Sequence, residues 1–330
     1  MDEQSFGVRL PARVLPAPRS ISAEARAALN RLVGADGMPI NAKYPMPDPE
    51  DHEGWVRIKA AVDAHYAASI KGLAGTLRAS VETVRVGNTL VHVATPETAI
   101  VTGAAYLDLH GGALVFGGGE ACRVDAQMQA DLHGVCCYGV DYRTPPEHPY
   151  PAALDDTLAA YGHVLERHAP SNVVIGGRSA GGNLAVAMLL RAREAGLPMP
   201  AGLVLLSPEV DLTESGDSFE VNRLVDLMLP LPLRAANLLY ASGADLSDPA
   251  LSPLFGDLSG LPPTLLQSGT RDLLLSNTVR MHRALRKAGV PAELHVFEAM
   301  PHGGFLGDTP EDLELSGELV RFVCTCLRGG

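Results

Sequence analysis

The amino-acid sequence predicts an α/β fold in which a mostly parallel β-sheet carries helices on both faces. Three observations lead to this prediction. Two short β runs follow each other directly from residue 81 as a hairpin, and the later β runs then alternate with helical segments. The 330-residue chain is also 46% hydrophobic with a mean hydropathy of +0.10, so it can bury a large core.

The expected elements follow from residue patterns along the chain. Short runs rich in Val, Leu and Ile predict strands at 81–87, 90–95, 104–112, 134–143, 172–177, 202–208, 263–269 and 292–298. Helical patterns separate most of the later runs, at 123–133, 151–168, 180–196, 277–289 and 311–327. Two further helical patterns, at 22–33 and 53–73, precede the first strand and are separated by a proline-rich stretch.

One insertion breaks the alternation. About fifty residues lie between the runs 202–208 and 263–269, including an apolar helical stretch at 219–243. A crossover between neighbouring strands needs far fewer residues. We therefore expect a helical cap formed by residues 1–75 and by an insertion at about 210–245, on a catalytic domain that spans 76–330.

Charge, termini and cysteine spacing exclude several classes of protein. The formal charge of −12 argues against nucleic-acid binding, which needs clustered Lys and Arg. The chain starts without a basic segment leading into an apolar one, and no apolar run approaches the roughly 18 residues of a membrane span, so we expect a cytoplasmic protein without membrane contact. Five cysteines without C-x-x-C spacing indicate buried free thiols rather than a metal site.

A G-x-S-x-G motif lies between the run 172–177 and the helix at 180–196. It reads Gly177-Arg178-Ser179-Ala180-Gly181, and a strand that opens through this motif directly into a helix is typical of a nucleophile elbow. The alternative is an ordinary glycine-rich turn between strand and helix. The partner residues that follow in the order Ser, Asp, His favour the nucleophile, and the extra glycines Gly176 and Gly182 fit close packing.

A serine nucleophile needs a base and a group that orients the base. Asp272 follows the run 263–269 and His302 follows the run 292–298, so both are expected at the same sheet edge as Ser179. The weaker acidic candidates lie in or just after the insertion: Asp245, Asp248 and Asp257. We expect His295 to pack within the last strand and His282 to be a solvated helix residue.

An oxyanion formed by attack on a carbonyl needs N–H donors. The run 104–112 ends in His110-Gly111-Gly112-Ala113, and loops of this type supply backbone donors. The expected donors are the N–H groups of Gly111, Gly112 and Ala180, with His110 holding the loop. No lysine or G-x-G-x-x-G spacing accompanies these glycines, which argues against a phosphate loop.

The segments HGGA, DYRTPPEHPYPAALDD, GGRSAGGN, GTRDLLL and MPHGGF together resemble the bacterial hormone-sensitive-lipase-like esterases, a branch of the α/β-hydrolases. The resemblance covers about residues 80–330. It implies an α/β-hydrolase fold with an eight-stranded core and a helical cap. It also implies carboxylester hydrolysis without a cofactor or metal, with Ser179 as nucleophile, His302 as base and Asp272 as its orienting group.

The resemblance extends to supporting residues and has two departures. It implies that one segment braces the site through Asp141, Tyr142, Arg143 and Glu147. Arg178 stands where the family most often has Asp, and Ala113 replaces the third glycine of the HGGG loop. A cation at a helix N-terminus is unfavourable, so we expect a carboxylate to pair with Arg178, and Glu209 just past the neighbouring strand is the candidate.

The expected activity is that of a serine carboxylesterase acting on short-chain or small-molecule esters, or on lactones, through an acyl-enzyme intermediate. Amide or carbamate hydrolysis on the same triad is the nearest alternative. A non-catalytic ligand receptor of the same fold is a further alternative, against which the complete triad argues. The expected partner is a small ester, and a homodimer is left open.

Overall fold

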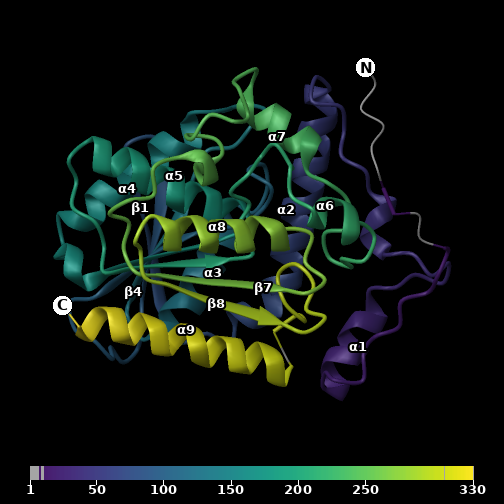
Figure 1. The fold of residues 1–330 in the computed structure, drawn as a ribbon. Coiled ribbons are helices and arrows are strands. Elements are labelled where there is room, and N and C mark those ends of the chain that lie inside the picture. The colour runs from purple at the N-terminus through teal and green to yellow at the C-terminus, as the bar shows by residue number, and fades with distance from the viewer. Residues whose placement is uncertain (1–6, 9–10, 308, 330) are drawn as a thin grey trace.

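In the computed structural model, which describes residues 7–8, 11–307 and 309–329, an eight-stranded sheet forms the centre of the molecule (Figure 1). The strands lie in the order β1-β2-β4-β3-β5-β6-β7-β8. Their bounds are β1 Ser80–Val86, β2 Thr89–Thr95, β3 Ala105–Leu109, β4 Cys136–Asp141, β5 Val173–Arg178, β6 Gly202–Leu206, β7 Thr264–Gly269 and β8 Ala292–Phe297. All eight predicted strands are present.

The direction of the strands decides where loops meet. β1 and β2 form an antiparallel hairpin and β2 is antiparallel to β4, whereas the other neighbouring pairs are all parallel. The loops that follow β3, β5, β6, β7 and β8 therefore emerge at one edge of the sheet. Every residue of β3 and β7 is buried, as expected for strands covered on both faces.

Helices cover both faces of the sheet, which confirms the predicted fold class. They are α3 Glu120–His133, α4 Ala152–Leu165, α5 Ala180–Glu194, α8 Leu275–Lys287 and α9 Pro310–Arg328. One apolar core cluster contains residues of α4, α5 and α8, and a second contains residues of α3 and α9. Figure 1 shows α8 and α9 on opposite sides of β7 and β8.

The two N-terminal helices, α1 Ala23–Arg31 and α2 His52–Ala74, both contact the insertion that follows β6. In one apolar cluster, Ala25 and Leu29 of α1 pack with Leu227 and Met300. In another, Trp55 of α2 packs with Phe116 and with the insertion residues Leu233 and Leu239. The N-terminal segment and the insertion thus share two apolar clusters, while the boundaries of a cap remain a prediction.

The prediction of a helical stretch at 219–243 is wrong for the residues in its middle, which are not helical. Only α6, Ser218–Val221, and α7, Arg234–Ala241, are helical there. Pro230 and Pro232 lie between them, and proline lacks the N–H that a helix interior requires. The intervening residues form a loop in which the Asp226 carboxylate accepts hydrogen bonds from the N–H groups of Met228 and Leu229.

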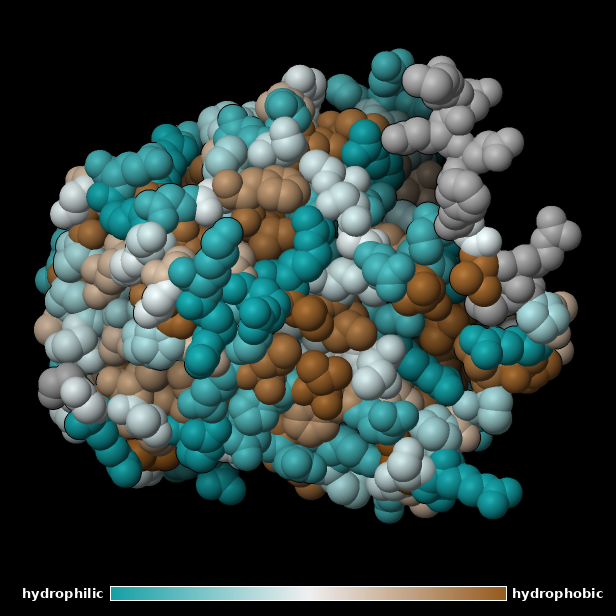
Figure 2. Space-filling model, viewed as in Figure 1, coloured by the Kyte–Doolittle hydropathy of each residue, from teal (hydrophilic) through white to brown (hydrophobic). Residues whose placement is uncertain are grey.

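Two further expectations concern cysteines and membranes. All five cysteines carry free thiols, as expected, but only Cys122 and Cys137 are buried; the expected burial is wrong for Cys136, Cys324 and Cys326, which are partly exposed. Among the described residues, every helix falls short of the length and apolar character that crossing a bilayer would take. On the face that Figure 2 shows, hydrophobic side chains are interspersed with hydrophilic ones.

We predict that Trp55→Ala destabilises the fold by about 3–5 kcal/mol, because the indole is fully buried and its removal leaves a cavity. The loss includes the hydrogen bond that its Nε1–H donates to the Asp48 carbonyl over 2.9 Å. Urea unfolding followed by circular dichroism measures the change. The neighbouring Val56 is 45% exposed, so Val56→Ala is the control; equal destabilisation by both substitutions would contradict this role of Trp55.

Candidate active site

Ser179 occupies a strained turn between β5 and α5. It lies at the N-cap of α5 with φ of 54° and ψ of −120°, a backbone conformation that residues other than glycine rarely adopt. The flanking glycines permit the turn because a Cβ atom on Gly177 would overlap the Gly181 carbonyl group. A Cβ atom on Gly181 would overlap the Leu109 carbonyl oxygen. The elbow therefore needs glycine at these positions, as the motif predicts.

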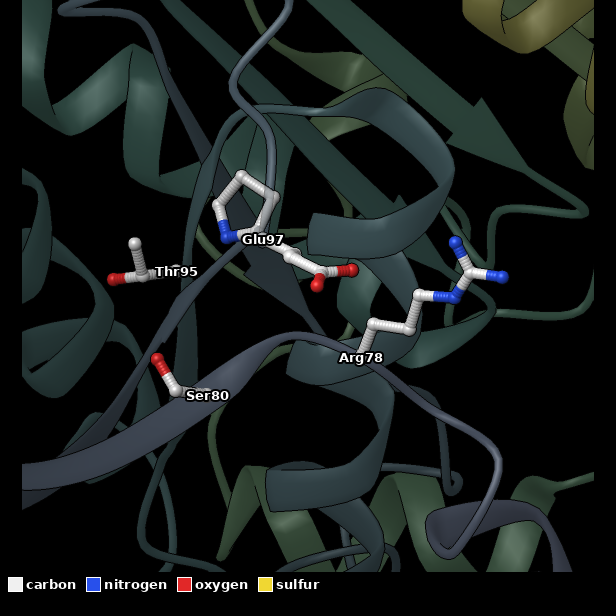
Figure 3. Close-up of a pocket in the computed structure, with 5 residues that line it drawn as sticks. Arg78, Ser80, Thr95 and Glu97 are labelled. Carbon is white, nitrogen blue, oxygen red and sulfur yellow. The ribbon is translucent and has the colours of Figure 1, made fainter.

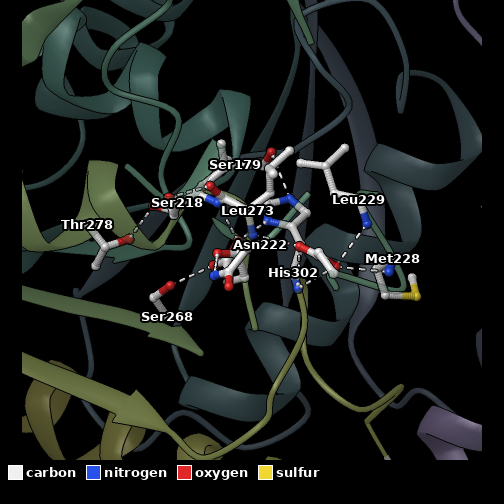
Figure 4. Close-up of polar contacts among 12 residues, drawn as sticks. Ser179, Ser218, Asn222, Met228, Leu229, Ser268, Leu273, Thr278 and His302 are labelled. Atoms are coloured by element: carbon white, nitrogen blue, oxygen red, sulfur yellow. Dashed lines mark hydrogen bonds and ion pairs between the residues drawn. The ribbon is translucent and has the colours of Figure 1, made fainter. Parts of the chain in front are cut away.

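The loops after β5, β7 and β8 bring Ser179, Asp272 and His302 together at the sheet edge (Figure 4). The Ser179 Oγ lies 3.0 Å from His302 Nε2, and His302 Nδ1 lies 3.1 Å from Asp272 Oδ1. The second oxygen of Asp272 accepts a hydrogen bond of 2.6 Å from the Ser268 hydroxyl. Serine, imidazole and carboxylate thus form one continuous chain of polar contacts.

Burial and neighbouring charges set the protonation states of Asp272 and His302. Burial alone would raise the pKa of the fully buried Asp272, but the charge of His302 and the hydrogen bonds from His302 and Ser268 lower it below its ordinary value. For His302, burial works to lower the pKa, whereas the charge of Asp272, helped by Asp226, raises it above its ordinary value. Asp272 is consequently an anion that stabilises the imidazolium form of His302.

The loop after β3 lies directly against Ser179. A Cβ atom on Gly111 would be 3.4 Å from the Cβ of Ser179, and Gly112 has a φ of 125°. Among the described residues, the N–H groups of Gly111 and Gly112 donate to no other protein group. The N–H of Ala180 belongs to the first turn of α5, where helix geometry leaves it free. These donors are suitably placed to receive an anion next to Ser179.

Ala113 and Leu114 continue this loop with φ of 52° and 62°. A left-handed conformation costs a residue with a Cβ atom about 1–2 kcal/mol, which glycine would avoid. Glycine, as in an HGGG-type loop, would therefore be less strained at position 113 than Ala113 is. The strain is sustained by packing, since Ala113 and Leu114 are both buried.

His110 holds this loop, as the sequence predicts. Its Nδ1 lies 2.7 Å from the Gly111 carbonyl oxygen, and its ring stacks on Tyr142 with 4.1 Å between centroids. The Tyr142 hydroxyl donates to the His110 carbonyl oxygen over 2.8 Å. Burial lowers the pKa of His110, which keeps the imidazole neutral.

Other residues of the segment 141–147 make contacts beside the same loop. Asp141 accepts a hydrogen bond of 3.0 Å from the Gly119 N–H. Arg143 forms a two-pronged ion pair with the buried Asp156, and Glu147 pairs with Lys59 of α2 at 2.9 Å. The segment therefore joins α2, α4 and the glycine-rich loop.

Sequence reasoning missed Asp226, which lies in the insertion and is fully buried beside the triad. Its carboxylate accepts hydrogen bonds from the N–H groups of Leu273 and His302, the first of which follows Asp272 in the chain. Asn222 lies in the same loop and donates to the Asp272 carbonyl oxygen over 2.8 Å. An Asp a few residues before Pro230 is a turn signal that was available in the sequence.

The predicted ion pair between Arg178 and Glu209 is wrong. Among the described residues, Glu209 is fully buried and neither of its carboxylate oxygens has a hydrogen-bond partner. The charge of Arg178 acts instead on Asp108 of β3, where it opposes the effects of burial and of Asp125 that raise the pKa of Asp108 to about 8. Strand neighbours share an edge of the sheet, but their side chains need not share a face.

The remaining candidates lie away from the triad. Asp245, Asp248 and Asp257 are exposed, and each accepts a local hydrogen bond from a residue two positions further on. His295 lies within β8, 3.6 Å from Glu293, and is partly exposed, as is His282 on α8. A surface hollow is lined by Arg78, Ser80, Thr95 and Glu97 (Figure 3), at the ends of β1 and β2 that lie opposite the edge carrying Ser179.

Comparison with known proteins gives a consistent set of relatives. The family described as alpha/beta hydrolase fold matches residues 106–306. An acetyl-hydrolase of Streptomyces hygroscopicus is 38% identical over 202 residues, which cover 61% of this chain and 68% of that relative. The matched region therefore leaves about a third of that relative unaligned.

Solved structures extend the similarity to nearly the whole chain. The crystal structure of an esterase named E25 has a TM-score of 0.89 and 34% identity, covering 96% of this chain and 98% of that one. The crystal structure of an esterase from the bacterial hormone-sensitive lipase family has a TM-score of 0.77 and 30% identity, covering 93% and 99%. The fold and the N-terminal region are thus both shared with known esterases.

We predict that Glu209→Gln stabilises the protein more at pH 8 than at pH 5. Burial raises the pKa of Glu209 from 4.5 to about 8, although the nearby Asn237 side chain and the charge of His302 oppose this shift. The folded state therefore keeps a proton that the unfolded chain releases, and stability is lost as pH rises through this window by up to about 1.4 kcal/mol per unit.

Thermal unfolding of both proteins at the two pH values measures this difference. Gln cannot ionise, so the melting temperature of the variant should fall less between pH 5 and pH 8 than that of the wild type. The exposed Glu220 of α6 provides the control substitution, Glu220→Gln. An identical pH dependence for wild type and Glu209→Gln would refute the burial of an uncompensated carboxyl group.

Proposed function

Because the chain belongs to the bacterial hormone-sensitive-lipase-like esterases of the α/β-hydrolase superfamily, which are carboxylic ester hydrolases, we propose that it hydrolyses esters with Ser179 as the nucleophile. The observation that carries this proposal is the 3.0 Å contact between Ser179 Oγ and His302 Nε2 on a strained elbow. A serine hydroxyl is a weak nucleophile unless a base within hydrogen-bond distance takes its proton.

The first half of the reaction forms an acyl-enzyme. As Ser179 Oγ attacks the ester carbonyl carbon, His302 Nε2 takes the hydroxyl proton and Asp272 stabilises the imidazolium. The carbonyl oxygen becomes an oxyanion that accepts hydrogen bonds from the N–H groups of Gly111, Gly112 and Ala180. His302 then donates its proton to the alkoxide, and the alcohol leaves.

The second half repeats these steps with water. His302 takes a proton from a water molecule that attacks the acyl carbon, and the resulting tetrahedral intermediate again places its oxyanion at the glycine loop. Collapse of the intermediate breaks the bond to Ser179 Oγ, which recovers its proton from His302. A lactone would follow the same route, with the alcohol remaining attached to the acyl chain.

We propose short-chain or small-molecule esters as substrates. Ser179 is only 5% exposed, and the side chains of α1, α2 and the insertion pack around the loops at this sheet edge. Such a site accommodates a small acyl group more readily than a long one. The name of the acetyl-hydrolase relative points in the same direction. A cytoplasmic location stays a prediction that cell fractionation would test.

We predict that Ser179→Ala and His302→Ala each lower kcat by about four orders of magnitude or more, because triad members act as a unit. Hydrolysis of p-nitrophenyl butyrate measures the loss, and thermal unfolding checks that both variants fold. Ser171→Ala is the matched control, since this exposed serine lies just before β5, at the opposite end of the strand. Near wild-type turnover by Ser179→Ala would remove the whole assignment.

We predict that kcat/KM is higher for acetyl and butyryl esters than for long-chain esters, because the packed cap limits the depth of the site. A series of p-nitrophenyl esters from two to sixteen carbons, with triolein and a p-nitroanilide as further substrates, measures the preference. Faster hydrolysis of triolein than of butyrate esters would contradict the short-chain proposal. Faster hydrolysis of the anilide would favour an amidase.

A further inference from the structure

We propose that Asp226, contributed by the insertion after β6, is a positioning residue that holds the two loops carrying Asp272 and His302 in register. This proposal rests on the proposed function, since it concerns the same triad. Asp226 touches the backbone of the triad loops rather than the reacting atoms, so it acts through His302.

The contacts of Asp226 connect three segments that are distant in sequence. Figure 4 labels its partners Leu273, His302, Met228 and Leu229. Its Oδ2 accepts a hydrogen bond of 2.8 Å from the Leu273 N–H, in the loop after β7. Both carboxylate oxygens lie 3.3 Å from the N–H of His302, in the loop after β8. Its Oδ1 accepts from the N–H groups of Met228 and Leu229, at 2.9 and 3.0 Å.

One side chain thus contacts both the backbone next to Asp272 and the backbone of His302. The distance between His302 Nδ1 and Asp272 Oδ1 depends on how these two loops are spaced. Beyond the last residue pair of β7 and β8, Gly269 with Phe297, hydrogen bonds still join the two loops: the Thr270 N–H donates to Phe297, the Arg271 N–H to Met300, and the Ala299 N–H to the Thr270 hydroxyl, over 2.9, 3.3 and 2.7 Å. The carboxylate of Asp226 adds a link further along both loops, at Leu273 next to Asp272 and at His302 itself.

A buried carboxylate beside the catalytic one carries an electrostatic cost, which indicates a specific role. Burial and the charge of Asp272 raise the pKa of Asp226 to about 6, while the charge of His302 and the backbone N–H donors of Leu229 and Leu273 lower it. A neutral residue in this position would avoid the repulsion. It would offer fewer acceptor sites to the four N–H groups, which a carboxylate can satisfy together.

The same residue couples the triad to the N-terminal segment. The Met228 carbonyl oxygen, two residues after Asp226, accepts a hydrogen bond of 2.8 Å from Asn41. Leu227 packs in the apolar cluster that contains α1 and Met300. The insertion is therefore a structural part of the catalytic centre as well as a cover over it, because its placement sets the carboxylate that aligns His302.

The test compares Asp226→Asn with a matched control, Asp312→Asn. Asp312, in the first turn of α9, is also a buried carboxylate that accepts backbone hydrogen bonds, from Phe305 and Gly307 at 3.0 Å in the connection between His302 and α9. Within the part of the chain that the structure describes, its side chain hydrogen-bonds to Phe305, Gly307 and Thr309 and to no residue of the triad or the insertion. Both substitutions should lower the melting temperature, which removes stability as an explanation for any difference in rate.

On p-nitrophenyl butyrate, Asp226→Asn should lower kcat about 100-fold with little change in KM, because misplacement of a catalytic group by about 1 Å costs on this order. Asp312→Asn should keep a kcat close to that of the wild type. Equal kcat losses in the two variants, or a wild-type kcat in Asp226→Asn, would overturn the proposal. Ser179→Ala, assayed in parallel, separates this outcome from failure of the proposed function, since only the latter leaves Ser179→Ala active.

The pH profile gives a second readout that a purely structural role would not move. The carboxyl groups acting on His302 are Asp272, Asp226 and Glu209, and a negative charge on Asp226 raises the pKa of His302. Asp226→Asn removes that charge, so the acid limb of kcat/KM, where His302 becomes protonated, should move to lower pH. Asp312→Asn should leave the limb in place.

Asp226→Glu keeps the charge and carries the test if Asp226→Asn does not fold. Its longer side chain displaces the carboxylate from the Leu273 and His302 N–H groups, so kcat should fall while the acid limb stays at the wild-type pH. A wild-type kcat in Asp226→Glu would overturn the positioning role. If the acid limb of kcat/KM moved in Asp226→Glu, which keeps the negative charge, the proposed effect of that charge on the pKa of His302 would be overturned.

Discussion

The strained backbone at Ser179 is the constraint on which the rest of the site depends. A positive φ at a residue with a side chain is unfavourable, and it persists here because β5, α5 and the loop after β3 enclose the turn too closely for it to relax. The Ser179 N–H donates to the Leu206 carbonyl oxygen over 2.9 Å, which ties the elbow to β6. The hydroxyl is thereby held at the sheet edge, beside the free N–H groups of the glycine loop.

The parallel sheet brings residues that are far apart in the sequence close together in space. Strands β3, β5, β6, β7 and β8 all end at one edge, so a donor loop, a serine, an aspartate and a histidine from distant positions meet there. Beyond the strand ends, both backbone and side-chain hydrogen bonds hold these loops. Ser268 and Asn222 hold the Asp272 loop, and Asp226 joins that loop to His302.

Buried charge is concentrated around His302. Asp272, Asp226 and Glu209 all influence its pKa, but they differ in how their charge is stabilised. Asp272 has the imidazole and Ser268 as partners, and Asp226 has backbone N–H groups, whereas the oxygens of Glu209 have none among the described residues. Ionisation is accordingly favoured at Asp272 and disfavoured at Glu209, where burial raises the pKa to about 8.

The sequence by itself determined the strand order along the chain, the elbow glycines and the identities of Ser179, Asp272 and His302 as a group that meets. These features depend on local patterns and on the rule that parallel strands end together. The tertiary structure alone decided which side chains face one another. Glu209 does not pair with Arg178, and Asp226 reaches residues 47 and 76 positions away through a loop that two prolines keep from being helical. Such contacts depend on side-chain direction and on loop paths, which a single sequence does not encode in any local pattern.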